Sequence, residues 1–345
     1  MIRGIEFIGL KMSNRSTIIF GNGLGMALDS NYFNLKTALS SVWNSSKVVT
    51  KEQKTLIKSA LPNFNDDSYP ESEEMLDNLH LAIDAAEFLK RFEKPEVEWL
   101  NENSREISKA FKTYIHEVGM YFHRSGKTLP QDFINELATY INETKSHVAV
   151  LNYDNLIYDA FCYAKVLDRY YGPLIDGFLP SGFSAKNLDR FNTNKHGWYL
   201  HLHGSPLFVG NTKATGYARD FLAPDDQSHI VLSHIKHKPS LIYRSNILSE
   251  YWERLSRAIG ESEVLIIFGY SGLDTHLNEI IKKNSSNKKI RVVEWIGEDS
   301  NSDRLMYWSQ LFNSSNLILT QCENILGFKN WLFNIQSDAD TSEED

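Results

Sequence analysis

The sequence has few cysteines and no long apolar run, and both absences narrow the functions that it can have. Two cysteines, Cys162 and Cys322, occur in 345 residues. Two thiols cannot form a four-thiolate zinc site or a disulfide framework, so we expect a reducing, cytoplasmic setting. No apolar run approaches the roughly 20 residues of a membrane span. The first residues, MIRGIEFIGLKMSNRS, lack the apolar core of a signal peptide.

An excess of positive charge is also missing. The chain has 36 basic and 44 acidic side chains, which gives a net charge of −8. Because phosphate backbones bind to basic surfaces, direct nucleic-acid binding is not expected as the main function. Neither a Gly-x-x-x-x-Gly-Lys-Ser/Thr loop nor a Gly-x-Ser-x-Gly turn occurs, which argues against a P-loop ATPase and against a hydrolase with a serine triad.

Short apolar runs separated by helical patterns predict an α/β fold. Five runs are typical of buried strands, at 16–20, 147–151, 198–203, 264–268 and 290–296. A sixth candidate strand is NLILT at 316–320. Several are continuously apolar or β-branched, as in a parallel sheet that is covered on both faces. We therefore expect a Rossmann-like, mostly parallel sheet flanked by helices.

The interval between the first two strands is too long for one crossover and predicts a helical insertion. Apolar residues recur there at helical spacing, at Met75, Leu79, Ala82, Ala86 and Leu89, at Ile107, Phe111, Tyr114, Val118 and Phe122, and at Phe133, Leu137 and Ile141. LPNFNDDSYP at 61–70 is expected to be a loop inside it. The expected organisation is an N-terminal arm (1–15), a Rossmann-like domain (16–30 and 147–335), a helical insertion (31–146) and an acidic disordered tail (336–345).

In open α/β sheets, ligands bind at the carboxyl ends of the strands. After the first strand comes Gly21-Asn22-Gly23-Leu24-Gly25. A backbone without side chains can approach a pyrophosphate closely, and the alternative is a tight turn that needs a positive φ. The acidic residue that a dinucleotide fingerprint places about 20 positions further on is missing.

Polar side chains follow the second and third strands. Asn152 and Asp154 share one side of an extended backbone and could hold ribose hydroxyls, or they could cap the following helix. His203 ends the third strand before Gly204 and is a candidate base. His201 is expected to be a packed core histidine, and a metal site at His201 and His203 would need further ligands that are not close in sequence.

The fourth strand is followed by GYSGLD. Gly269, Ser271 and Gly272 repeat the pattern of a strand that runs into small residues. Ser271 could lie near a bound phosphate or ribose. Asp274 is expected to cap the helix that begins with THLNEIIKK, a contribution of about 1 kcal/mol.

The order of these strand-end motifs resembles the sirtuin-like NAD-hydrolase family of bacterial antiviral systems. Sirtuins have a Gly-Ala-Gly loop, an Asn-x-Asp motif and a His-Gly pair in this order, and here GNG (21–23), NYD (152–154) and HG (203–204) take those places. The stretch GNGLGMALDSNYFNLKTALSSVW is further similar to a subgroup found beside a HerA-type hexameric translocase. The resemblance covers about 16–30 and 147–300.

The resemblance implies that NAD is the substrate and that no metal is needed. It implies catalytic roles for Asn152, His203 and Asp154. The implied cofactor-binding residues are Gly21, Asn22, Gly23, Gly25, Gly204, Gly269, Ser271 and Asp274. The products would be nicotinamide and ADP-ribose, in an abortive-infection response to phage.

A homo-oligomer and a HerA-type ATPase partner are implied by the same resemblance. The two cysteines cannot supply the four-cysteine zinc ribbon of deacylating sirtuins, which favours hydrolysis of free NAD. The alternatives are a non-catalytic NAD or ADP-ribose sensor, or a scaffold for a partner ATPase or nuclease. A deacylase or ADP-ribosyl transferase would need an acceptor site that the sequence does not reveal.

Overall fold

A seven-stranded parallel sheet forms the centre of the computed structural model, which describes residues 15–45, 49–59, 69–89, 98–190, 192–214, 229–232 and 238–331. Its strand order is β11-β10-β9-β1-β2-β6-β3, and every neighbouring pair in it is parallel. These strands are β1 (Ser16–Phe20), β2 (His147–Val150), β3 (Leu174–Ile175), β6 (Gly197–His201), β9 (Val264–Phe268), β10 (Lys289–Trp295) and β11 (Leu317–Cys322). The expected α/β, Rossmann-like class is confirmed.

The six predicted strands correspond to β1, β2, β6, β9, β10 and β11, while β3 is not among the predicted strands. Alternate side chains of the buried strands enter two separate cores. Ile18 and Phe20 pack on one face of the sheet, and Ile19 packs on the other. Both faces are covered, which explains why these strands are apolar throughout rather than alternating.

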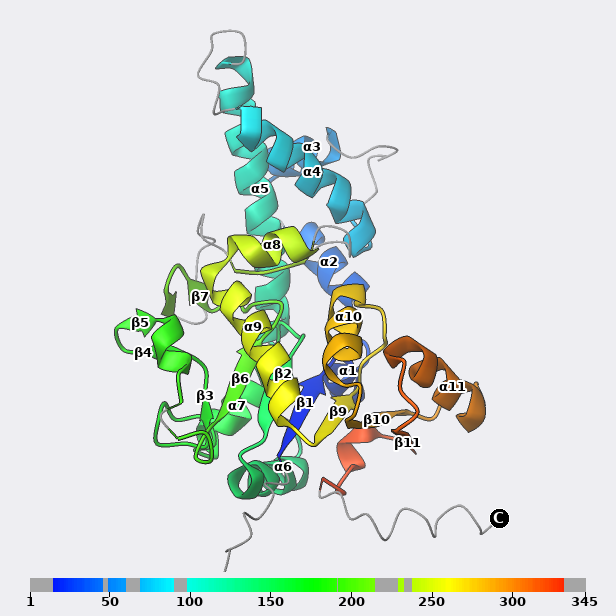
Figure 1. Cartoon of the computed structure of the whole chain (residues 1–345). Coiled ribbons are helices and arrows are strands. Elements are labelled where there is room, and N and C mark those ends of the chain that lie inside the picture. Colours follow the sequence, from blue (N-terminus) through cyan, green and yellow to red (C-terminus); the bar gives the residue numbers. More distant parts are fainter. Residues whose placement is uncertain are drawn as a thin grey trace, which may run out of the picture.

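Helices cover both faces and connect the strands (Figure 1). They are α1 (Gly23–Leu28), α2 (Leu35–Asn44), α3 (Lys51–Ser59), α4 (Glu73–Leu89), α5 (Glu98–His123), α6 (Gln131–Thr144), α7 (Leu156–Tyr163), α8 (Lys238–Arg244), α9 (Asn246–Glu261), α10 (Thr275–Asn284) and α11 (Asn301–Phe312). Two small hairpins, β4 (Phe178–Leu179) with β5 (Gly182–Phe183) and β7 (Phe208–Val209) with β8 (Thr212–Lys213), lie outside the main sheet. Among the described residues, no helix is long and apolar enough to span a membrane.

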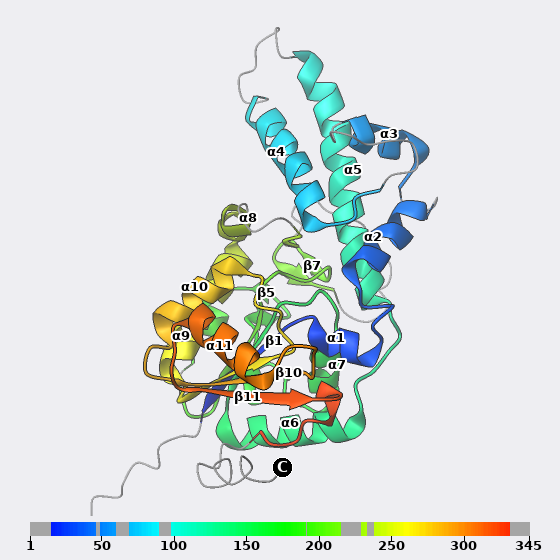
Figure 2. The ribbon, with the colours of Figure 1, turned by 90° about the vertical axis from the view of Figure 1, so that its right-hand side faces the viewer.

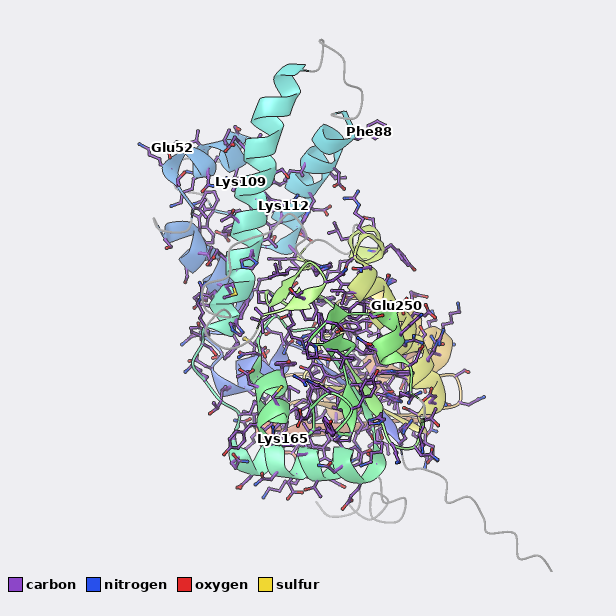
Figure 3. All side chains as sticks on the ribbon, turned by 90° about the vertical axis from the view of Figure 1, so that its left-hand side faces the viewer. Glu52, Phe88, Lys109, Lys112, Lys165 and Glu250 are labelled. Atoms are coloured by element: carbon purple, nitrogen blue, oxygen red, sulfur yellow. The ribbon has the colours of Figure 1, made fainter. Side chains whose placement is uncertain are left out.

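The segment between β1 and β2 contains α1 to α6, and two of its helices project from the sheet. Figure 2 shows α4 and α5 rising side by side away from the strands. With 26 residues, α5 is about 39 Å long at 1.5 Å per residue. Exposed side chains such as Glu52 of α3 and Phe88 of α4 lie on this projecting part (Figure 3).

The base of the projection is continuous with the sheet core. Phe133 of α6 contacts Phe268 of β9 with ring centroids 5.6 Å apart, and Tyr114 of α5 donates a hydrogen bond to the carbonyl of Leu39 at 3.0 Å. The predicted arm (1–15, apart from Arg15), the tail (336–345) and most of the loop at 61–70 lie outside the described residues.

Candidate functional site

A cavity of about 880 Å³ opens at the carboxyl ends of the parallel strands. Its volume falls within the range of about 300–1,000 Å³ that is common for small-molecule sites. The loops after β1, β2, β6, β9 and β10 line it, together with α8 and the start of α4. Strand β1 lies between β2 and β9, so the chain order reverses beside it, which is where ligands bind in open α/β sheets.

Most of the predicted site residues line this cavity. They are Asn22, Gly23, Asn152, Asp154, His203, Gly269, Ser271 and Asp274. Gly21, Gly25 and Gly204 are not part of the lining. The arrangement brings together the strand-end segments that are distant in the sequence, with His203 and Asn152 facing one shared space.

Asn152 is held by the glycine loop. It is 5% exposed, and its Nδ2 donates a hydrogen bond to the carbonyl of Gly21 at 3.1 Å. That bond orients the amide. Its oxygen Oδ1 is buried and has no hydrogen-bond partner in the described part of the chain. A buried acceptor without a partner is costly, so this oxygen is suited to a donor brought by a ligand or by a water.

His203 is joined to Asp274. Its Nε2 lies 2.9 Å from Oδ2 of Asp274, and both side chains are buried. Burial alone would raise the pKa of Asp274, but the hydrogen bond that His203 donates and the positive charge of Lys238 outweigh it and hold that pKa well below its usual range. The ionised carboxylate can only accept, so Nε2 carries the proton and the ring lone pair lies on Nδ1.

Asp274 also begins α10, as the sequence predicted. Its Oδ1 accepts a hydrogen bond from the backbone N–H of Leu277 at 3.0 Å, which is an N-cap. The two carboxylate oxygens of Asp274 therefore contact different groups. One fixes the helix end and the other contacts His203 and Lys238.

Asp154 serves the local structure. Its Oδ1 accepts from the backbone N–H of Leu156, the first residue of α7, at 3.0 Å, whereas the N-cap position of that helix is Asn155, whose side chain makes no capping hydrogen bond. Burial raises the pKa of Asp154 to about 6, although hydrogen bonds from Leu156 and Asn152 oppose the shift. Its one contact with another predicted catalytic residue in the described part of the chain is the hydrogen bond from Asn152, and its own catalytic role stays a prediction.

Gly21 and Gly23 of the first loop permit close packing between backbones, and none of the loop's three glycines serves a turn with positive φ. A Cβ on Gly23 would lie 2.5 Å from the carbonyl oxygen of Gly269, and one on Gly21 would lie equally close to it. The N–H of Gly23 donates to that same carbonyl at 2.8 Å. None of Gly21, Gly23 and Gly25 has a positive φ, whereas Gly204 does, with a φ of +81°.

His201 is packed away from the cavity. It is 3% exposed, its ring contacts Tyr199 and Phe208 edge-on, and burial lowers its pKa to about 3, so the ring is neutral. The expectation of a core histidine agrees with this. Within the described ranges, no group of three or more His, Cys, Asp or Glu side chains is arranged to hold a metal.

The sequence analysis did not identify two pairs of oppositely charged residues in the lining, Lys238 with Glu73 and Arg304 with Glu294. Lys238 contacts Asp274 and Glu73, and neither its own segment nor that of Glu73 carries a motif. At the β10 end of the cavity, Arg304 donates from Nε and Nη2 to the two oxygens of Glu294, at 3.0 and 2.6 Å. Glu294 could have been found from the sequence, because it is a carboxylate at the end of a strand. Its partner Arg304 could not, because it lies on a different element, α11.

Residues 146–313 match the family model of the SIR2-like domain. No curated protein matches the chain. The matched range includes the loops after β2, β6, β9 and β10, and therefore Asn152, His203, Asp274 and Glu294. These residues are therefore similar to a SIR2-like domain, and such domains are in general NAD-dependent enzymes.

Proposed function

From this sirtuin-like domain, we propose that the chain is an NAD⁺ hydrolase that cleaves the nicotinamide–ribose bond and releases nicotinamide and ADP-ribose. One observation carries the proposal. Asn152 and His203, from loops after neighbouring strands β2 and β6, line the same cavity as the glycine loop after β1. An amide oxygen without a partner among the described residues and an imidazole lone pair are thus available to one ligand.

Hydrolysis of the nicotinamide–ribose bond requires a water molecule, a base and a group that orients the ribose or the water. A water oxygen bonds to C1′ of the nicotinamide ribose while the C1′–N1 bond breaks, and the bonding electrons return to the pyridinium ring. The water loses a proton, which Nδ1 of His203 is placed to accept. Asn152 Oδ1 would accept from a ribose hydroxyl or from the attacking water. Positioned proton transfer contributes about 10²–10⁴-fold to such a step.

The charges in the cavity suit the two ends of the substrate differently. Carboxylates of Glu73, Asp154 and Asp274 lie in the lining and favour a cationic group such as the nicotinamide ring. Arg304, which is hydrogen-bonded to Glu294, places a cation at the β10 end of the cavity. We place the pyrophosphate or the adenosine of NAD⁺ at this end. The glycine loop keeps its predicted role as a pyrophosphate contact.

The biological setting follows the family resemblance. We propose that NAD depletion arrests phage-infected cells, that the enzyme works in the cytoplasm as a homo-oligomer, and that a HerA-type ATPase controls it. Such an activity would be toxic without control, which is the reason to expect a partner. The main alternative, a sensor or scaffold, predicts binding of NAD or ADP-ribose without turnover.

The test is nicotinamide release from NAD⁺ by the purified full-length protein, alone and with the partner ATPase, measured by chromatography. His203→Ala and Asn152→Ala are expected to lower the rate by about 10²-fold or more. His196→Ala and Asn44→Ala, outside the cavity lining, are the matched controls. If neither the protein nor its complex releases nicotinamide, the proposal fails. A modified acceptor in place of free ADP-ribose would indicate a transferase or a deacylase.

A further inference from the structure

Lys238 is a buried lysine with two carboxylate partners. It is the first residue of α8 and is 5% exposed. Its Nζ lies 3.3 Å from Oδ2 of Asp274 and 3.3 Å from Oε2 of Glu73. Burying an ammonium group costs several kcal/mol unless opposite charges compensate it. The position of this side chain is therefore closely tied to both carboxylates.

The two partners belong to different parts of the fold. Asp274 precedes α10 beside the sheet, whereas Glu73 is the first residue of α4 in the helical insertion. Oδ2 of Asp274 is shared by His203 and Lys238, while Oδ1 is fixed by the N–H of Leu277. An ionic chain thus runs from α4 through Lys238 and Asp274 to His203.

The charges along this chain alternate, which has a consequence for the imidazole. A neighbouring carboxylate stabilises an imidazolium over a neutral imidazole, and a nearby ammonium opposes that effect. An imidazolium has no lone pair and cannot accept a proton. Lys238 offsets the charge of Asp274 at the oxygen that faces the ring, and Glu73 holds the ammonium in place.

We propose that Lys238 is a positioning residue that acts through Asp274 to keep His203 a neutral base, and that Glu73 makes this positioning depend on helix α4 of the insertion. The proposal deepens the proposed hydrolase site and rests on it for its effect on turnover. The electrostatic effect on His203 can be measured without turnover. The insertion is then part of the reaction site rather than an attachment to it.

The first measurement is the ring ¹⁵N chemical shift of His203 in the full-length protein labelled with ¹⁵N-histidine, assigned by its loss in His203→Gln. In the wild type we expect the shifts of a neutral ring protonated at Nε2. In Lys238→Met we expect the His203 signals to move toward those of imidazolium, while the His201 signals stay in place. Lys238→Arg keeps the charge and is expected to restore the wild-type pattern.

The second measurement is steady-state nicotinamide release. Lys238→Met is expected to lower kcat about tenfold or more with KM changed less than threefold, and Lys238→Arg to recover most of kcat. Glu73→Gln is expected to lower kcat less, and the double variant Glu73→Gln/Lys238→Met to fall short of the product of the two single effects. Lys282→Met, on the exposed face of α10, is the matched control.

The outcomes separate this inference from the proposed function. If the wild type releases nicotinamide but Lys238→Met leaves both kcat and the His203 shifts unchanged, the lysine serves stability only and the inference is overturned. If no form of the protein releases nicotinamide, the hydrolase proposal fails, and the ¹⁵N shifts alone then decide whether Lys238 controls the state of His203.

Discussion

The contact between Asp274 and His203 makes Asp274→Asn the most informative single substitution. Asparagine is as good an N-cap as aspartate, so its Oδ1 can still accept from Leu277 and α10 keeps its start. What changes is the atom that faces His203. An amide nitrogen in place of Oδ2 donates where the carboxylate accepted at 2.9 Å. The ring then turns its lone pair to Nε2 and its proton to Nδ1.

The magnitude follows from the loss of a correctly placed base. General base catalysis is worth about 10²–10⁴-fold, which at about 1.4 kcal/mol per factor of ten is roughly 3–5 kcal/mol of transition-state stabilisation. We expect kcat to fall by that factor with KM within about threefold of the wild type, because Asn152 and the remaining lining are unchanged. The stability cost is limited, since Lys238 keeps Glu73 at 3.3 Å.

The assay is steady-state nicotinamide release over a range of NAD⁺ concentrations, with thermal unfolding of the same preparations. Asp303→Asn makes the same chemical change in the first turn of α11, outside the cavity lining, and should leave kcat unchanged. A kcat for Asp274→Asn within threefold of the wild type would refute the assigned tautomer and the role of His203 as base. A low kcat together with loss of folded protein would be resolved by the melting curve.

Two further predictions concern stability. Gly23→Ala places a Cβ 2.5 Å from the Gly269 carbonyl oxygen and 2.6 Å from its Cα, and should destabilise the fold by about 1–3 kcal/mol or more in urea unfolding. Gly260→Ala, in α9, has no atom of the described residues within 4 Å of the added Cβ and should be neutral or stabilising, and equal effects of the two substitutions would contradict the packing role of Gly23. His147 is fully buried and burial lowers its pKa to about 4, against about 6.5 in the unfolded chain. The stability that depends on a neutral His147 is complete above about pH 6.5 and is lost as the pH falls toward 4. The free energy of unfolding should therefore drop by up to about 3 kcal/mol between about pH 6.5 and pH 4. A His147→Gln variant should show a flatter dependence of stability on pH.

The strands could be predicted because burial on both faces leaves a strong local pattern. VLIIF at β9 and STIIF at β1 are continuous apolar or β-branched runs, and the two-residue β3 is too short to leave such a run. Since parallel strands place their carboxyl ends along one edge, the meeting of Asn152 and His203 followed from the fold class. The capping role of Asp274 was visible for the same local reason.

The ionic contacts of the cavity could not be predicted, because they depend on how distant segments approach each other. Asp274 and His203 are 71 positions apart, and Lys238 comes from a stretch without helical or strand periodicity. Glu73 lies at the start of a helix, where an acidic residue is ordinarily explained by the helix dipole alone. Gly21 and Gly23 of the first loop were also open to several explanations until the backbone of Gly269 was placed beside them.

The place of β1 in the sheet limits how the chain can be shortened. β1 lies between β2 and β9 and pairs with both, yet it precedes the residues that match the family model. A fragment trimmed to 146–313 would lack its middle strand and would leave two apolar strands with open edges, which invite aggregation. A truncated protein for crystallisation or delivery must therefore retain residues 16–20, joined by a linker or supplied as a separate complementing peptide.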